Sequence, residues 1–477
     1  MHRMGQLDTQ STDDTLLSAN EADTRSMRRA ALTVAVLTAF MIPFVSSSVT
    51  IALPSIGKEF DADAIVLAWV RTSYLLTAVM FLIPFGRLGD IFGRKRVFTT
   101  GVSLYTAASF LCALAGSSST LIAFRCLQGL GASMTFGTAT AILTSAYPAS
   151  ERGKVLGIRV ATVYIGLSMG PFLGGLLTQH LGWRSIFYVN LALGALVVTT
   201  IFTRLRAEWA DAKGEKFDIP GSLIISIALA ATIYGFSNLA VEWGMWLLSA
   251  GIIGIAGFVF LQVRASSPLL DVRLFSKNRV FAFSNLAALI NYSAVAATAF
   301  FLSLYLQTVK GMDPQTAGLV ILVQPVTQST LAVFAGKLSD RVEPRIVAST
   351  GMAFTAIALG LLSFLGQGTS TGYIMGSLVV LGFGFALFSA PNTNAIMGSV
   401  KKRHYGVASA TQGTMIITGM TLSMGIAMLL LDIYVGKVQI TSEHFAGFLQ
   451  SLRMAFSIFT ALCVLGIFAS LSRGKVR

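Results

Sequence analysis

Long apolar runs separated by short polar gaps make up nearly the whole chain after residue 30. A helix of about 18 residues or more, rising about 1.5 Å per residue, crosses a hydrocarbon core about 30 Å thick. We therefore predict an all-α integral membrane protein with fourteen membrane-spanning helices. The predicted spans are residues 30–54, 66–85, 97–116, 119–146, 154–178, 184–203, 219–240, 244–263, 279–306, 315–336, 345–366, 371–398, 404–431 and 447–471.

Basic residues gather in every second gap between these runs. Arg94, Lys95 and Arg96 fill one such gap and Lys401, Lys402 and Arg403 another, whereas the intervening gaps hold only Lys58, Arg184, Lys310 and Lys437. Lys and Arg favour the cytoplasmic side of a membrane. The pattern predicts a multi-pass protein of the cell membrane with both termini in the cytoplasm.

Composition supports the membrane class and excludes others. The chain is 54% hydrophobic and 12% charged, whereas soluble domains carry about 25% charged residues. The net charge of +14 is divided among short gaps, so we expect no nucleic-acid binding. Three cysteines lie inside apolar runs and four histidines are scattered over termini and loops. We therefore expect no disulfide, metal site or cofactor, and a disordered segment over the polar residues 1–29.

Residues 86–98 (GRLGDIFGRKRVF) form a glycine-rich, basic connection between the second and third spans. This string resembles the loop at the same place in transporters of the major facilitator superfamily. Gly86, Asp90, Gly93 and Arg94 fall on that pattern, as do Leu88 and Lys95. The resemblance implies a cytoplasmic gate in which Asp90 and Arg94 pair with the other half of the molecule or with a helix end in the outward-facing state.

The fourth span carries a charged residue near its start, Arg125, followed by Gln128. An arginine inside a span costs about 2.5–3.5 kcal/mol on insertion scales, so it usually has a task, although a long side chain can also reach the interface. Residues 125–131 (RCLQGLG) resemble the fourth-span motif of the same superfamily. The resemblance implies that Arg125 serves proton coupling.

The fifth span carries glycines four residues apart beside a proline. Such spacing bares one helix face and allows a close neighbour. The segment resembles the antiporter motif of the superfamily's exporters, which places Gly166, Gly170, Pro171, Gly174 and Gly175 in that motif. The same stretch spells the G-x-S-x-G of hydrolases around Ser168, but it lacks the strand, acid and histidine that a nucleophile elbow needs. We predict that the protein is not an enzyme.

A weaker copy of the 86–98 motif occurs at residues 335–341 (AGKLSDR), after the tenth span. Two six-span halves with an extra pair of spans between them follow from this repeat. The layout resembles the fourteen-span drug:proton antiporter family. The predicted parts are a cytoplasmic N-terminus (1–29), an N-terminal bundle (30–203), a linker with spans 7 and 8 (204–278), a C-terminal bundle (279–471) and a cytoplasmic tail (472–477).

Two features depart from that family's pattern. No Asp or Glu lies deep in any span, and Val45 stands where an aspartate is frequent. Arg71 and Arg159 are unusual charges inside the second and fifth spans, although each is near enough to a span end to reach headgroups. The candidate substrate-binding residues are Arg71, Tyr74, Gln128, Arg159, Asn291, Tyr292, Gln324, Gln328, Asn392 and Gln412.

The resemblance implies a major facilitator fold that exports small amphipathic, drug-like compounds by alternating access, in exchange for protons. The alternative is an exporter of organic anions, in which Arg71, Arg125 and Arg159 give the cavity a positive field. A membrane receptor is a weaker hypothesis, because we find no room for a sizeable soluble signalling domain. The expected partners are a small-molecule substrate, protons and the lipid bilayer, and we expect a monomer.

Overall fold

The structure is a computed structural model, which describes residues 4–205, 207–210, 212–239, 241–265, 268–270, 273–339, 342–400, 405–436 and 438–474. The described residues form helices and loops without a strand. The elements are α1 (Met4–Phe60), α2 (Ala64–Phe92), α3 (Arg94–Ala113), α4 (Ser118–Ala146), α5 (Ala149–Leu181), α6 (Arg184–Arg204), α7 (Ile219–Ser237), α8 (Glu242–Arg264), α9 (Arg273–Lys277), α10 (Arg279–Val295), α11 (Thr298–Leu304), η1 (Tyr305–Val309), α12 (Pro314–Ser339), α13 (Pro344–Leu362), α14 (Thr371–Gly398), α15 (Tyr405–Tyr434), η3 (Ser442–His444) and α16 (Phe445–Ser472).

The helices follow the predicted apolar runs. Eleven helices of the described residues are long and apolar enough to cross a membrane. Among them, α10, α11 and η1 together form one long segment, Arg279–Val309. Three further runs coincide with α3, α4 and α12, which are also long helices packed among the others. An all-α membrane protein is therefore confirmed, and the count of fourteen spans stays a prediction.

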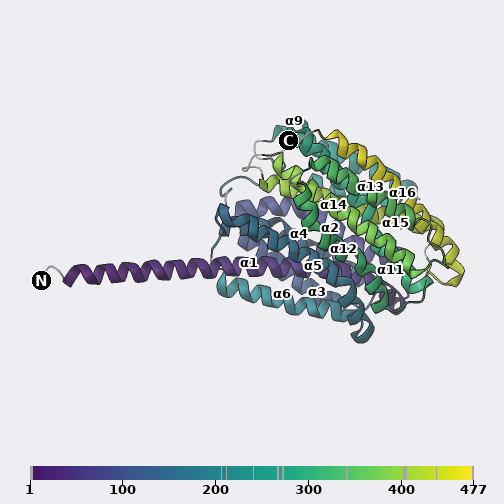
Figure 1. The fold of residues 1–477 in the computed structure, drawn as a ribbon, viewed down its shortest axis with the longest axis horizontal. Helices are drawn as coiled ribbons and strands as arrows, with labels where there is room; N and C mark the ends of the chain where they lie inside the picture. Colours follow the sequence, from purple (N-terminus) through teal and green to yellow (C-terminus); the bar gives the residue numbers. More distant parts are fainter. Residues whose placement is uncertain are drawn as a thin grey trace.

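The first helix differs from its predicted limits. We expected disorder over residues 1–29 and a span over 30–54, whereas α1 is a single helix, Met4–Phe60. Its first part projects from the bundle, as Figure 1 shows in purple. Extending an existing helix requires no new nucleus, which is the costly step of helix formation.

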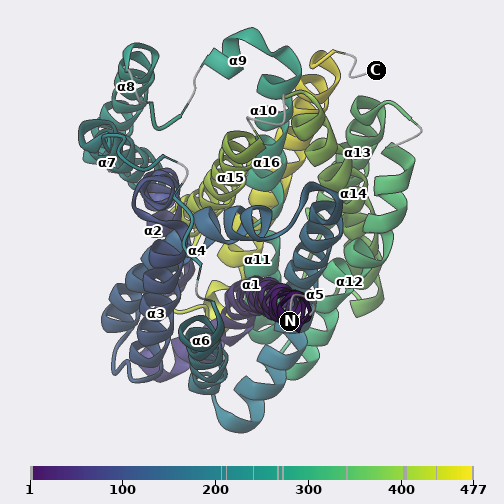
Figure 2. The ribbon, with the colours of Figure 1, turned by 90° about the vertical axis from the view of Figure 1, so that its left-hand side faces the viewer.

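Two groups of helices make up the body. The first helical group (α1–α6) and the second helical group (α10–α16) are each held by internal packing, and they meet through α2 with α15, α5 with α12, and α1 with α11. The pair α7 and α8 stands outside both groups, where α7 contacts α2 and α15. Figure 2 shows this pair beside α2.

The two groups diverge towards one end of the molecule. Figure 1 shows α1 and α5 along the long axis, with α13, α14 and α16 inclined to them. The start of α1 and the end of α16 lie at the same end, which we call the termini end. The opposite end, with the α1–α2 and α11–α12 loops, is the far end. Every hydrogen bond described between the two groups lies at the far end or near mid-helix. The far end is therefore closed.

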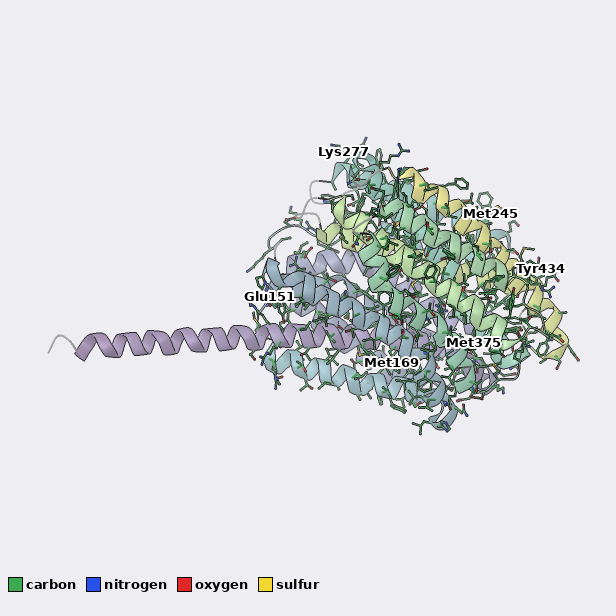
Figure 3. All side chains as sticks on the ribbon, viewed as in Figure 1. Glu151, Met169, Met245, Lys277, Met375 and Tyr434 are labelled. Carbon is green, nitrogen blue, oxygen red and sulfur yellow. The ribbon has the colours of Figure 1, made fainter. Side chains whose placement is uncertain are left out.

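Apolar side chains cover the flanks of the bundle and charged ones lie at its ends. Met169, Met245 and Met375 are at least 40% exposed along α5, α8 and α14. Figure 3 shows Glu151 and Lys277 at the termini end instead. This distribution suits a protein with lipid around its sides.

One basic residue of the predicted tail is not solvent-exposed. Arg473 was expected in the segment 472–477 but is fully buried. Its NH1 donates to Asn392 Oδ1 at 2.9 Å and to Ser284 Oγ at 3.2 Å, and its NH2 donates to the Pro344 carbonyl at 2.8 Å. Burial lowers the pKa of Arg473 to about 10, so the side chain stays charged at neutral pH. Three acceptors from α10, α13 and α14 explain why it folds inward.

Candidate functional site

The 86–98 motif forms the turn between α2 and α3 at the termini end. The turn passes through Gly93, whose φ of +116° is a conformation that side chains rarely adopt. Gly137 of α4 lies close to Gly86, since a Cβ on Gly137 would lie 3.0 Å from the Gly86 Cα, whereas a Cβ on Gly86 would meet nothing within 4 Å. Arg94 donates to Asp90 Oδ1 at 2.7 and 2.9 Å. The two residues therefore bind each other within the first helical group.

The same guanidinium also reaches α4. Its NH1 donates to Ser145 Oγ at 2.9 Å, so Arg94 ties the α2–α3 turn to a neighbouring helix. The weaker copy of the motif ends at Asp340 and Arg341, which lie outside the described residues.

Arg125 lies fully buried between α4 and α2. Its Nε donates to the Val70 carbonyl at 3.1 Å, its NH1 donates to Gln128 Oε1, and its guanidinium carbon lies 4.4 Å from the centre of the Tyr74 ring. NH2 has no partner. A buried donor without a partner costs free energy, so this NH2 can still bind an acceptor.

The polar network around Arg125 continues across the first group. Gln128 Nε2 donates to Ser109 Oγ at 2.8 Å, and Asn190 Nδ2 donates to the same oxygen at 2.5 Å. Helices α3, α4 and α6 thus meet on one hydroxyl group. The described hydrogen bonds of this network involve no carboxylate.

Arg71 crosses from α2 to the second helical group. Its NH2 donates to the Ala296 carbonyl at 2.9 Å, at the break between α10 and α11. Ser423 Oγ accepts from the Ala297 N–H at 2.9 Å on the other side of this break. Since a helix C-terminus carries partial negative charge, an arginine there is favourable. Arg71 therefore lies at the contact between the groups.

Arg159 lines a small cavity between α1, α4 and α5. The cavity, with a volume of about 10 Å³, also touches Thr38, Pro43, Thr135 and Val163. Such a volume holds about one water molecule. The Nε of Arg159 is buried without a partner, so this side chain can still bind a hydrogen-bond acceptor.

The glycines of the fifth-span motif face α1. A Cβ at Gly166 would lie 2.6 Å from the Phe40 carbonyl oxygen, and one at Gly174 would lie 2.6 Å from Ser48 Cα. Gly170 meets Ser47 more closely still. Larger residues would separate the two helices.

The end of the same motif faces the second helical group. A Cβ at Gly175 would lie 2.5 Å from the Pro314 carbonyl oxygen, and Gly318 of α12 packs on the Pro171 carbonyl. The motif therefore serves two contacts, within its own group and with α12 at the far end.

Three of the six predicted residues of the second group have side-chain contacts within that group. Asn392 donates to the Ser284 carbonyl at 3.0 Å, and Gln412 donates to Thr393 Oγ1 at 2.7 Å. Tyr292 packs edge-on against Phe385, with ring centres 5.1 Å apart.

Three further candidates lie on α10 and α12. Asn291 is fully buried with neither amide atom bonded. The backbone of Gln324 lies against Gly382, and Gln328 is buried. Asn291 thus keeps free hydrogen-bonding capacity, as Arg159 does.

Ser168 does not form a nucleophile elbow. It lies within the continuous helix α5, and its Oγ is buried without a partner. A nucleophile elbow needs a sharp turn between a strand and a helix, which α5 lacks.

Sequence reasoning missed several contacts between the two groups. Tyr164 of α5 shares a hydrogen bond with Ser389 of α14 at 3.0 Å. Ser303 donates to the Thr50 carbonyl at 2.8 Å and Gln307 to the Ile51 carbonyl at 2.9 Å. Isolated polar residues in apolar runs were the available signal, but the sequence does not indicate which helix each one reaches.

Comparison with known proteins identifies the class of this arrangement. A family model described as the Major Facilitator Superfamily matches residues 35–287 and 284–475. The chain is 30% identical to the riboflavin transporter RibZ of Clostridioides difficile, over 90% of this chain and 93% of that protein. It is 32% identical to the multidrug resistance protein Stp of Mycobacterium tuberculosis, over 81% of this chain and 73% of that protein.

Other similarities point the same way. The multidrug efflux pump LfrA of Mycolicibacterium smegmatis is 29% identical, over 84% of this chain and 80% of that protein. Among solved structures, the nucleoside transporter NupG superposes with a TM-score of 0.64 at 15% identity, over 93% of this chain and 99% of that one. A bacterial homologue of the human lysosomal transporter Spinster, in an inward-facing and unoccupied conformation, gives 0.63 at 16% identity, over 93% and 97%.

Proposed function

Because the chain belongs to the major facilitator superfamily, we propose that it exports small drug-like compounds by alternating access in exchange for protons. Relatives named for multidrug resistance and efflux cover most of the chain, although a riboflavin transporter is also among them. The observation that carries the proposal is the close meeting of α5 and α12 at Pro171 and Gly318, which joins the two helical groups towards the far end.

The proposed halves are the bundles 30–203 and 279–471, with α7 and α8 in the segment 204–278 between them. The termini end faces the cytoplasm in this proposal, since the basic gaps of the sequence lie there. The closed far end then makes the structure inward-facing. The transporter works as a monomer and binds no nucleic acid.

Arg125 is the proposed coupling residue. An arginine keeps its proton in proteins, so a different group carries the transported proton. Arg125 acts on that group through its charge and through the bonds to Val70 and Gln128. The Asp90–Arg94 pair is proposed to hold the cytoplasmic turn during the cycle.

Proton flux in proteoliposomes tests the proposal. With an imposed pH gradient and a lumenal pH dye, adding the lipophilic cation ethidium is expected to drive proton movement. Arg125→Ala is expected to abolish it. If neither ethidium nor an organic anion moves protons through the wild-type protein, proton coupling is wrong.

Arg159 favours a second candidate, the export of organic anions. Its Nε is buried and unbonded beside a cavity, and a carboxylate would satisfy it. This function predicts that fluorescein drives proton movement and that ethidium does not. Arg159→Ala or Arg71→Ala should abolish the movement driven by fluorescein. Arg71 also keeps two buried donors without a partner, Nε and NH1, although its NH2 already binds the Ala296 carbonyl.

A further inference from the structure

The turn between α2 and α3 leaves backbone groups that need partners. Gly93 ends α2 and precedes α3, and it offers α3 no side chain that could cap its first N–H groups. The first N–H groups and last carbonyls of any helix lack partners within the helix. Something outside the turn has to bind them.

The segment between α6 and α7, which we call the linker, caps the start of α3. Glu208 Oε1 accepts from the Lys95 N–H at 2.8 Å, and the Trp209 carbonyl accepts from the Arg94 N–H at 2.8 Å. A carboxylate at a helix N-terminus also interacts favourably with the helix dipole. Two successive linker residues therefore replace a local N-cap.

The next linker residues hold the end of α2. The Ala212 N–H donates to the Asp90 carbonyl at 3.0 Å. Glu215 forms an ion pair with Arg87, one turn earlier on α2. The linker thus binds both helices of the turn, and one of its contacts is the backbone of Asp90.

Gly93 and Glu208 fit each other closely. A Cβ at position 93 would lie 2.6 Å from Glu208 Cδ and Oε1. The glycine therefore leaves room for the Glu208 carboxylate and also suits the positive φ of the turn.

Helix α7, which the linker enters, has its own anchor on α2. Ser226 Oγ donates to the Met80 carbonyl at 2.8 Å. Against α15, α7 packs Phe236 and Ser237 on Gly425. Linker and α7 are both fixed to the first helical group.

We propose that the linker is part of the gating turn, with Glu208 as the residue that positions it. Glu208 keeps the Asp90–Arg94 pair in place and makes α7 and α8 move with the first helical group. This inference rests on the proposed transport function. It gives the extra helix pair a role in the cycle.

Two readouts test this role in the full-length protein. Hydrogen–deuterium exchange reports on the Arg94 and Lys95 amides, and ethidium export from proteoliposomes gives turnover and KM. Glu208→Ala is expected to speed exchange of these amides about fivefold, the factor typical of a lost cap. It should lower turnover about tenfold with KM unchanged, which indicates a defect in a conformational step.

Control variants separate capping from general damage. Glu208→Gln keeps an acceptor oxygen and is expected to retain most of the protection and turnover. Glu151→Ala removes another carboxylate of the termini end, paired with Arg28 at 3.7 Å, and should change neither readout. If Glu208→Ala does not accumulate, Glu208→Asp should shift both readouts in the same direction by a smaller factor.

Two results would overturn the inference: unchanged amide exchange in Glu208→Ala, or faster exchange with unchanged turnover. Failure of the proposed function looks different. If the wild-type protein moves no ethidium while Glu208→Ala still loosens the turn, the capping contact stands and the transport role is wrong.

Discussion

At the scale of single residues, the buried guanidinium of Arg473 has a structural task that can be measured. It donates to acceptors on Asn392, Ser284 and Pro344. Arg473→Ala leaves these acceptors without their donor, and each buried unsatisfied group costs about 1–3 kcal/mol. We expect a lower melting temperature in detergent, measured by thermal unfolding of the purified variant.

Arg453 provides the matched control. It is an arginine near the start of α16, but it is exposed, and its Nε donates to the Leu365 carbonyl at 3.1 Å. Arg453→Ala should change the melting temperature little. Equal losses for both variants would mean that burial of Arg473 does not contribute to stability.

The sequence predicts pairs that are close along one helix better than pairs that the fold creates. Arg125 and Gln128 are three residues apart, so they share a helix face and are found bonded. Asp90 and Arg94, four apart, are bonded too, and the partner expected for them in the outward-facing state stays a prediction. The contact of Arg473 with Asn392 joins segments far apart in the chain, and no local pattern indicates it.

At the scale of elements, the glycines of α5 set the distance to α1. A Cβ at Gly170 would overlap the Ser47 side chain, and overpacking costs about 1–3 kcal/mol. Gly170→Ala is therefore expected to lower thermal stability. Gly157 lies in the same helix, and a Cβ added there would meet nothing within 4 Å, so Gly157→Ala should raise stability by about 0.5–1 kcal/mol.

Opposite signs for these two alanines are the result to look for in thermal unfolding. A gain in stability from Gly170→Ala would show that α1 and α5 can separate without cost. Our account of the α5 motif as a close-packing surface would then be wrong.

The sequence predicts that a helix exists more reliably than it predicts where the helix begins, ends or breaks. Long apolar runs predict the helices because only helices and barrels satisfy the backbone in lipid. The break at Ala296 and Ala297 could not be predicted in this way, because it contains no glycine or proline. It is held by Arg71 and Ser423 from other helices, so tertiary contacts decide it.

At the scale of the whole molecule, alternating access requires the far end to open. Asp61 Oδ1 accepts from Gln439 Nε2 at 2.6 Å, across the two helical groups. Cysteines at these two positions, joined by a short reducible cross-linker, should hold the far end closed and stop ethidium export. Reduction should restore it. The native cysteines, Cys112, Cys126 and Cys463, are replaced beforehand.

A second cysteine pair separates loss of motion from damage by the cross-link. Glu59 and Arg184 form an ion pair at 2.6 Å at the same end, but both belong to the first helical group. Cysteines there, cross-linked in the same way, should leave export unchanged, because the two residues move together. Export that continues through a cross-link between positions 61 and 439 would contradict rocking of the groups. It would instead require a path that opens while the far-end loops stay joined.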